Sequence, residues 1–280
     1  MIIPSASEKR ESFWKLHESG CFVLPNPWDA GSAQLLTGMG FKALATTSSG
    51  HAWSCAKPDG YMKRDAVLEH VRSMVQATHL PINADFESGF GEAPSDVFES
   101  VQLVVATGVA GFSIEDSTGD TQAPVRDVQE AVERVRAARK AIDASGTNTL
   151  LVARAENFFV GRLDLPDTIK RLQAYAEAGA DCLYAPGIRT RDEIATVVSA
   201  VAPKPVNILI GWNSELTVSE LSDLGVRRIS VGGALARAAW NGFHNAAQAL
   251  ANGRFDAFPD SPTAAALNQV FLGAAPTDTR

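Results

Sequence analysis

Apolar residues in this chain of 280 residues fall into eight short, nearly continuous runs separated by longer, mixed segments. A short continuous apolar run is typical of a strand that is covered on both faces. The longer segments carry apolar residues at helical spacing, as at Val128, Ala131, Val132, Val135 and Ala138, which share one face of a helix. The pattern therefore predicts strands that alternate with helices.

We predict strands over residues 21–25, 43–47, 82–85, 111–115, 150–154, 182–185, 206–210 and 228–231. We predict helices over residues 5–19, 30–39, 64–78, 95–107, 125–145, 165–178, 191–201, 218–224, 234–252 and 263–272. Eight alternating strand–helix units imply an α/β fold with a parallel sheet that closes into a single (β/α)8 TIM barrel. We expect the barrel in residues 1–255, with an N-terminal helix, and a C-terminal helical tail in residues 256–280. The tail has an apolar side that we expect to pack on its own barrel or on a neighbouring subunit.

Charge and composition exclude some classes of function. The formal net charge of −7 argues against a nucleic-acid-binding protein, whose surface is normally basic. No run of about 20 apolar residues is present to span a membrane, and residues 1–10 lack the order of a signal peptide. Cys21, Cys55 and Cys182 are far apart in the sequence and have no metal-binding spacing. We expect Cys21 and Cys182 to be buried thiols in a cytoplasmic protein.

Carboxylates follow two neighbouring strands, at the ends where barrel enzymes place their functional residues. Asp85 and Glu87 end the third strand, and Glu115 ends the fourth. Residues i and i+2 of an extended segment point to the same side, so Asp85 and Glu87 are aimed together. Such a pair shares a proton, binds a cation or stays in open water. Several carboxylates without histidine or cysteine at ligand spacing favour Mg²⁺, or Mn²⁺.

Acidic residues near strand ends can also cap helices, and we assign that role to Asp96 and Asp127. Arg154 ends the fifth strand, where an arginine needs a partner. It either forms an ion pair with Glu156 or Glu115, or it binds an anionic substrate group or a developing oxyanion.

The second strand leads into Ser49, Gly50 and His51. We interpret these residues as a small turn whose backbone amides can bind a carboxylate. His51 is either an acid–base group or an ordinary loop histidine, since no partner for it is visible in the sequence.

Eight stretches carry a resemblance that spans Leu24 to about Leu235. They are PNPWDAGSA at 25–33, TSSG at 47–50, DG at 59–60, NADFESGFG at 83–91, GFSIED at 111–116, ARAE at 153–156, AGAD at 178–181 and PVN at 205–207. In these stretches the chain resembles the isocitrate lyase/phosphoenolpyruvate mutase superfamily. The resemblance implies a (β/α)8 barrel that binds a small-molecule 2-oxo acid, or its enol form, on Mg²⁺. It also implies a homo-oligomer, a dimer or tetramer in which C-terminal helices swap between paired subunits.

The resemblance also implies roles for individual residues. Asp85, Glu87 and Glu115 match the metal shell, with Asp85 as the direct ligand and the other two acting partly through water. Ser49, Gly50 and His51 match the turn that holds the substrate carboxylate.

Three further residues match positions around the substrate. Arg154 matches the arginine that contacts the substrate oxygens, and Asn207 matches a polar position that faces the substrate. Asp59 matches an acid that is catalytic in the mutase branch.

The chain departs from the superfamily in the loop after the fourth strand. That loop, residues 117–124, lacks the acid–base cysteine of isocitrate and methylisocitrate lyases and the lysine-bearing gate of the mutase branch. We therefore predict a Mg²⁺-dependent carbon–carbon lyase or decarboxylase that acts on a small 2-oxo or 2-hydroxy carboxylate through a metal-stabilised enolate. Asp59, Glu156 or a metal-bound water would serve as its base, and the loop could act as a lid.

Two alternatives remain open from the sequence. One is the P–C bond chemistry of a phosphonopyruvate hydrolase or phosphoenolpyruvate mutase. The other is a barrel that binds a 2-oxo acid without turning it over, because a fold and its site can outlast an activity.

Overall fold

The computed structural model describes residues 4–258 and 261–272. Its one sheet has eight parallel strands, which neighbour one another in the order β1-β8-β7-β6-β5-β4-β3-β2. Between β1 and β2, the N–H of Ala45 donates to the carbonyl of Pro25 at 3.0 Å. The predicted (β/α)8 TIM barrel is therefore confirmed. The strands are β1 (Phe22–Leu24), β2 (Leu44–Ala45), β3 (Ile82–Asp85), β4 (Gly111–Glu115), β5 (Leu150–Arg154), β6 (Cys182–Tyr184), β7 (Val206–Leu209) and β8 (Arg228–Ser230).

The helices of the described residues include one that the apolar pattern did not predict. This helix, α3, contains Ser49, Gly50 and His51, so the predicted turn is corrected to a helix. Its seven residues have no apolar periodicity, and it begins because Thr47 caps it, with Oγ1 accepting from the N–H of Gly50 at 3.4 Å. The helices are α1 (Ala6–Glu18), α2 (Ala30–Gly38), α3 (Ser48–Ser54), α4 (Arg64–Ala77), α5 (Pro94–Val105), α6 (Val128–Ala144), α7 (Leu165–Glu177), α8 (Arg191–Val201), α9 (Val218–Asp223), α10 (Ala234–Ala251) and α11 (Ala264–Phe271).

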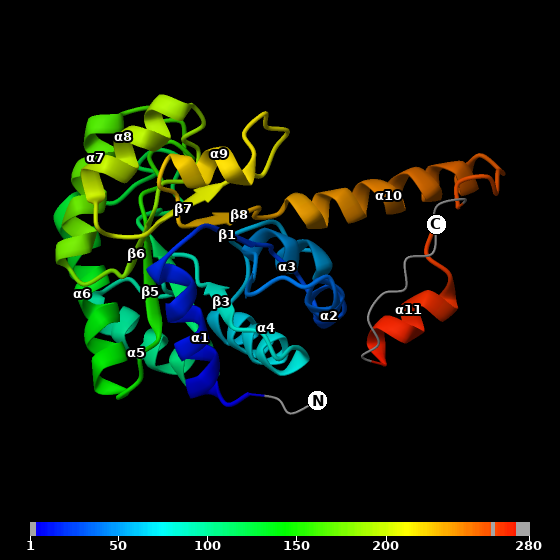
Figure 1. The fold of residues 1–280 in the computed structure, drawn as a ribbon, viewed down its shortest axis with the longest axis horizontal. Coiled ribbons are helices and arrows are strands. Elements are labelled where there is room, and N and C mark those ends of the chain that lie inside the picture. Colours follow the sequence, from blue (N-terminus) through cyan, green and yellow to red (C-terminus); the bar gives the residue numbers. More distant parts are fainter. Residues whose placement is uncertain (1–3, 259–260, 273–280) are drawn as a thin grey trace.

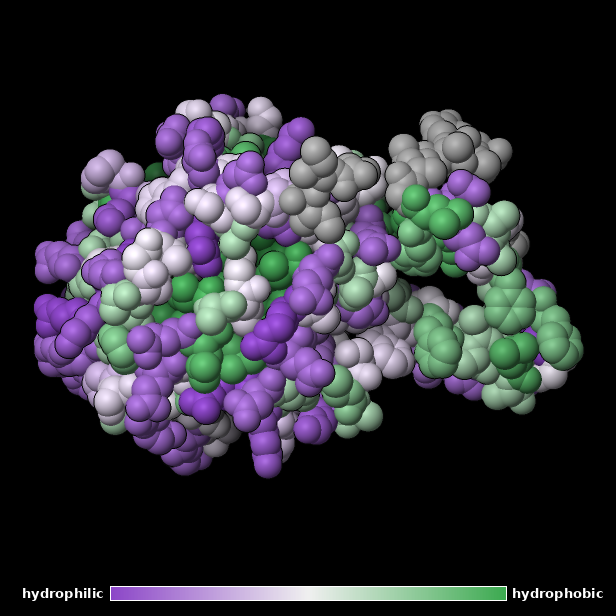
Figure 2. Space-filling view, turned by 90° about the horizontal axis from the view of Figure 1, so that it is seen from below, coloured by the Kyte–Doolittle hydropathy of each residue, from purple (hydrophilic) through white to green (hydrophobic). Residues whose placement is uncertain are grey.

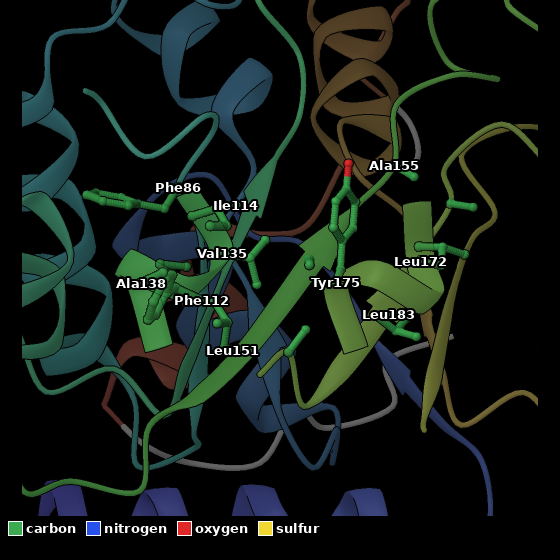
Figure 3. Packing of buried hydrophobic residues seen from close by; sticks show 14 of the residues in the cluster. Phe86, Phe112, Ile114, Val135, Ala138, Leu151, Ala155, Leu172, Tyr175 and Leu183 are labelled. Atoms are coloured by element: carbon green, nitrogen blue, oxygen red, sulfur yellow. The ribbon is translucent and has the colours of Figure 1, made fainter. Parts of the chain in front are cut away.

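The main core lies between the outer face of the barrel and its helices. Phe112 of β4 and Leu151 of β5 point outward and belong to one cluster with Val135 and Ala138 of α6 (Figure 3). Successive residues of a strand point to opposite faces. The alternate positions of β4, among them Ser113, therefore face the inside of the barrel.

A second cluster fills part of the barrel interior. It contains Phe13 of α1, which is fully buried, together with Leu24, Leu150 and Val152 of the strands. A Cβ on Gly111 would lie 2.9 Å from the ring of Phe13, so only glycine allows this close approach. The N-terminal helix thus closes the inside of the barrel with an aromatic ring.

The last two helices form an arm that projects from the barrel (Figure 1). On it Trp240, Phe243 and Phe255 are exposed, and green, apolar residues gather on this part of the molecule in Figure 2. The ring of Phe271 in α11 would lie 3.8 Å from a Cβ on Gly31, so α11 packs beside α2. The division of the chain at residue 255 and the exchange of this arm between subunits stay predictions. Across the described residues, every helix is too short or too polar to cross a membrane.

Candidate active site

A cavity of about 860 Å³ opens at the carboxyl ends of the strands. Its volume is in the range of small-molecule sites. Its lining includes Ser49, Trp53, Asp59, Asn83, Asp85, Ser113, Arg154, Phe158, Tyr184, Arg189, Trp212, Arg228 and Ser230.

Arg154 joins three carboxylates at the wall of this cavity. Its Nη1 lies 3.1 Å from Asp85 Oδ1 and 3.1 Å from Glu115 Oε2, and its Nε donates to Glu156 Oε1 at 2.8 Å. The ring of Tyr184 lies beside the guanidinium, 5.1 Å from Cζ to the ring centroid. Arg154 is therefore both an ion-pair partner and a cation at the cavity wall. The two alternatives from the sequence, an ion pair and a cation that can bind an anionic substrate group, are compatible in this structure.

Burial and mutual attraction set the protonation of this cluster. Burial alone would lower the pKa of Arg154, but Glu115, Glu156 and Asp85 outweigh it and raise that pKa well above its usual range. Burial raises the pKa of Glu115 and of Glu156, and Arg154 opposes both shifts. The guanidinium therefore stays charged, and its positive charge limits how far burial raises the pKa of Glu115 and Glu156.

Asp85 is held rigidly at the edge of the cavity. Its Oδ2 accepts from the N–H of Ser48 at 2.9 Å, and its own N–H donates to Thr46 Oγ1 at 2.8 Å. The first turn of α3 therefore binds a carboxylate of the protein. The N–H groups of Gly50 and His51 are engaged with Thr47, whereas Ser49 lines the cavity.

Glu87 does not continue the strand that Asp85 ends. Its φ of +47° places it in the left-handed region, so the i, i+2 argument fails beyond the end of β3. Glu87 lines a small pocket that it shares with Asp85, His51 and His70. Burial, with help from Asp85 and Asp59, raises the pKa of Glu87 to about 8.

His51 and Asn207 do not line the large cavity. The ring of His51 stacks on that of His70 with 3.8 Å between centroids, and burial lowers its pKa. Asn207 is fully buried, where its Nδ2 donates to Ser230 Oγ at 2.9 Å and its Oδ1 accepts from Arg228 Nε at 2.8 Å. Asp59 does line the cavity, and burial raises its pKa.

The donor set at this wall consists of oxygen atoms, which suits a hard cation. Among residues 4–258 and 261–272, no three Asp, Glu, His or Cys side chains converge closely enough to hold an ion by themselves. Mg²⁺ commonly binds one or two carboxylates and keeps several waters. The residues therefore fit a hydrated Mg²⁺ ion, and the assignment of Asp85 as the direct ligand, with Glu87 and Glu115 acting through water, stays a prediction.

Asp116, next to Glu115, is a buried carboxylate with three hydrogen-bond partners in the protein. Its Oδ2 accepts from the hydroxyl of Tyr175 at 2.6 Å and from Arg171 at 3.0 Å, while its Oδ1 accepts from the N–H of Glu156 at 2.8 Å. The tyrosine hydroxyl points out of the apolar cluster of Figure 3. Asp116 therefore fixes the backbone beside Arg154.

The loop at residues 117–124 folds back on itself. The N–H of Thr118 donates to the carbonyl of Pro124 at 3.1 Å, and Thr118 Oγ1 donates to the carbonyl of Ala123 at 2.6 Å. No residue of this loop lines the large cavity. Its action as a lid stays a prediction.

Sequence reasoning missed the polar residues inside the barrel. Asn83, Ser113, Arg228 and Ser230 all line the cavity. A signal was present, because each lies two positions from another polar strand residue, as in the pairs Asn83/Asp85 and Arg228/Ser230. Polar residues at i and i+2 in an apolar strand mark one polar face.

Comparisons with known proteins agree with this geometry. The sequence profile of the phosphoenolpyruvate phosphomutase family matches residues 13–251. A crystal structure of a putative lyase/mutase from Burkholderia cenocepacia J2315 has 47% sequence identity and a TM-score of 0.92, covering 95% of this chain and 97% of that one.

Two curated relatives extend the comparison. An uncharacterized protein of Mycobacterium tuberculosis is 30% identical over 246 residues, 86% of this chain and 90% of its own length. An oxaloacetate decarboxylase of Rhodopseudomonas palustris is 32% identical over 196 residues, 67% of this chain and 64% of its own length. The chain therefore belongs to the phosphoenolpyruvate mutase family, within the isocitrate lyase/phosphoenolpyruvate mutase superfamily.

Proposed function

We propose that this protein is a Mg²⁺-dependent carbon–carbon lyase or decarboxylase that acts on a small 2-oxo or 2-hydroxy carboxylate. The observation that carries the proposal is the contact of Arg154 with Asp85, Glu115 and Glu156 at the wall of a large cavity. The cluster offers oxygen ligands for a hard cation and a charged donor for an anionic substrate. The relatives named oxaloacetate decarboxylase and putative lyase/mutase support the same class of reaction.

Bound Mg²⁺ would supply Lewis-acid polarisation of the substrate's carboxylate and 2-oxo oxygens. Arg154, already fixed by its carboxylates, would donate to the oxygen on which negative charge develops as the carbon–carbon bond breaks. Ser49 would bind the substrate carboxylate with its hydroxyl, at the start of α3. Arg154 is held in place before the substrate arrives, which favours the transition state, in which negative charge develops on the 2-oxo oxygen, over the ground state, in which that oxygen is uncharged.

The need for a base depends on the substrate. Loss of CO₂ from an oxaloacetate-like acid requires none, whereas cleavage of a 2-hydroxy acid requires removal of the hydroxyl proton. Asp59 lines the cavity, Glu156 is 2% exposed and bound to Arg154, and His51 lies in the small pocket beside Glu87. We therefore assign the base first to Asp59, with Glu156 and His51 as further candidates.

The test is a panel assay of 2-oxo and 2-hydroxy di-acids with and without Mg²⁺, which follows release of the 2-oxo acid product. A parallel assay of phosphate release from phosphonopyruvate tests P–C bond chemistry. Asp85→Ala should abolish Mg²⁺-dependent turnover, whereas Glu69→Gln, at an exposed position of α4, should not change it. If the parent binds Mg²⁺ but turns over no acid of the panel, the lyase assignment fails; phosphate release from phosphonopyruvate would then indicate P–C bond chemistry, and its absence a non-catalytic binding barrel.

A further inference from the structure

Arg228 is a buried cation that has only neutral hydrogen-bond partners. It is 2% exposed, at the start of β8. Its Nε donates to Asn207 Oδ1 at 2.8 Å, and its Nη1 donates to Asn83 Oδ1 at 3.3 Å. In the part of the chain that the structure describes, no carboxylate lies within ion-pair distance of it. Buried charges are normally paired, so we expect an anion to bind beside this arginine.

The other neighbours of Arg228 supply no negative charge. The ring of Phe13 lies 6.0 Å from Cζ, and burial lowers the pKa of the guanidinium itself. Cys182 and Tyr184 are the ionisable groups that favour its charged form, and burial raises their own pKa values to about 11 and about 12. Both are neutral at pH 7.

Arg228 lines the large cavity, and other donors lie with it on the cavity floor. Ser230 Oγ accepts from Asn207 Nδ2 at 2.9 Å and donates to the hydroxyl oxygen of Tyr184 at 3.5 Å. Among the described residues, no acceptor takes the hydroxyl protons of Tyr184 and Ser113 or the protons of Arg228 Nη2. Arg228, Ser113, Tyr184 and Ser230 therefore supply a positive charge and hydroxyl donors, and none of the four has a carboxylate of its own.

We propose that the floor of the cavity binds a carboxylate-sized monoanion, held by the guanidinium of Arg228 and the hydroxyls of Ser113 and Tyr184. The anion is either a free small ion or the second carboxylate of a bound di-acid. Only this second source rests on the function proposed above. Tyr184 connects the two regions, since its ring packs on Arg154 and its hydroxyl faces Ser230 on the floor.

The first experiment titrates the metal-free protein with potassium formate, with ionic strength held constant by a bulky sulfonate. Calorimetry and thermal unfolding should both show saturable binding, with a Tm that rises with formate. Arg228→Met should lose this response, whereas Arg189→Met, at an exposed arginine on the cavity rim, should keep it. A parent protein with no saturable response to formate overturns the proposal.

A second variant covers the case in which Arg228→Met does not fold. Ser113→Ala removes one donor and keeps the guanidinium, so formate should bind about tenfold more weakly, as expected for one hydrogen bond to a charged group. An unchanged formate affinity in Ser113→Ala would remove the hydroxyl from the site and overturn the proposed geometry.

The third measurement identifies the source of the anion. Formate is titrated in the presence of Mg²⁺ and either pyruvate, a mono-acid, or 3,3-difluorooxaloacetate, a di-acid analogue that replaces oxaloacetate because oxaloacetate itself would be turned over; the analogue is checked for integrity at the end of the titration. Loss of formate binding with the di-acid alone assigns the floor to the second carboxylate of the substrate; retention with both acids assigns it to a free anion. A protein without lyase activity would still bind formate, so failure of the function and failure of the site are distinguishable.

Discussion

Arg154 Nη1 lies 3.1 Å from Asp85 Oδ1, and this contact joins β5 to β3 across the strand between them. Glu115 of the intervening strand β4 lies 3.1 Å from the same nitrogen. One guanidinium group at the end of β5 thus holds together the carboxylates that end the two neighbouring strands β3 and β4. Arg154 and these carboxylates therefore form one connected charge cluster, so a substitution at Arg154 changes the surroundings of both carboxylates at once.

Arg154→Lys tests the role of the guanidinium. Lysine keeps the charge but cannot donate in the fixed fork geometry that reaches several carboxylates at once. We expect kcat/KM to fall about 100-fold or more, as for loss of one transition-state donor. Arg154→Ala should also lower the free energy of unfolding by ~3–5 kcal/mol, because buried carboxylates lose their counter-ion. Steady-state kinetics and urea unfolding measure the two effects, and an unchanged rate in Arg154→Lys would exclude Arg154 from the mechanism.

Asp85→Asn tests the proposal that Asp85 would bind Mg²⁺ directly and that Glu87 and Glu115 would act through water. Asparagine keeps the shape and can still accept from the N–H of Ser48, but it loses the charge. Mutation of a residue that acts on a metal indirectly typically lowers metal affinity about 10–100-fold. Loss of the direct ligand should lower Mg²⁺ affinity by more than that range. For Glu115→Gln the loss of Mg²⁺ affinity should stay within the ~10–100-fold range. Calorimetric titration with Mg²⁺ compares the two, and equal losses would contradict the assignment.

Glu87 predicts a pH dependence of the metal-free protein. Burial raises its pKa from 4.5 to about 8, so the folded state binds more protons than the unfolded state between these values. The free energy of unfolding should therefore fall as the pH rises from about 4.5 to about 8. Urea unfolding in the presence of a chelator measures this slope. Glu87→Gln cannot ionise and should show a flatter profile; identical profiles would show that Glu87 does not titrate there.

Tyr175→Phe tests the support of the site by Asp116. The tyrosine is 1% exposed, and its hydroxyl donates to Asp116 Oδ2 at 2.6 Å. Removal of this donor leaves a buried carboxylate underpaired and should lower the free energy of unfolding by ~1–3 kcal/mol. Tyr61→Phe is the matched control, because Tyr61 is 71% exposed and should tolerate the change. Chemical denaturation measures the free energy of unfolding of both variants. An equal value for Tyr175→Phe and Tyr61→Phe would show that the Tyr175 hydroxyl does not support the site.

The arm formed by α10 and α11 predicts self-association. Phe243 is 67% exposed on α10 and lies in edge-to-face contact with Trp240. Aromatic residues exposed together mark interaction surfaces, and we expect a second copy of the chain to cover them in a dimer or tetramer. Size-exclusion chromatography with light scattering should give this mass for the parent and a smaller one for Phe243→Lys. A monomeric parent at micromolar concentration would contradict the expectation.

Much of the fold could be predicted because the apolar pattern is local. The predicted barrel is the one observed, and Asp85, Glu115 and Arg154 end their strands as expected. Helix α3 was missed, since its polar residues show no periodicity and its start depends on the cap by Thr47. The position of Glu87 was missed because Glu87 itself adopts the left-handed conformation, which departs from strand geometry.

The sequence by itself determined the eight strand–helix units and the carboxylates at their ends, because hydrophobic period and strand register act over a few residues. Only the tertiary structure decided which charges meet. Arg154 and Asp85 are 69 positions apart, and the stack of His51 on His70 joins two different helices. Whether a buried group meets a carboxylate, like Arg154, or only amides, like Arg228, depends on the order and tilt of strands around the barrel. That order brings together residues whose interaction has no local signature in the sequence.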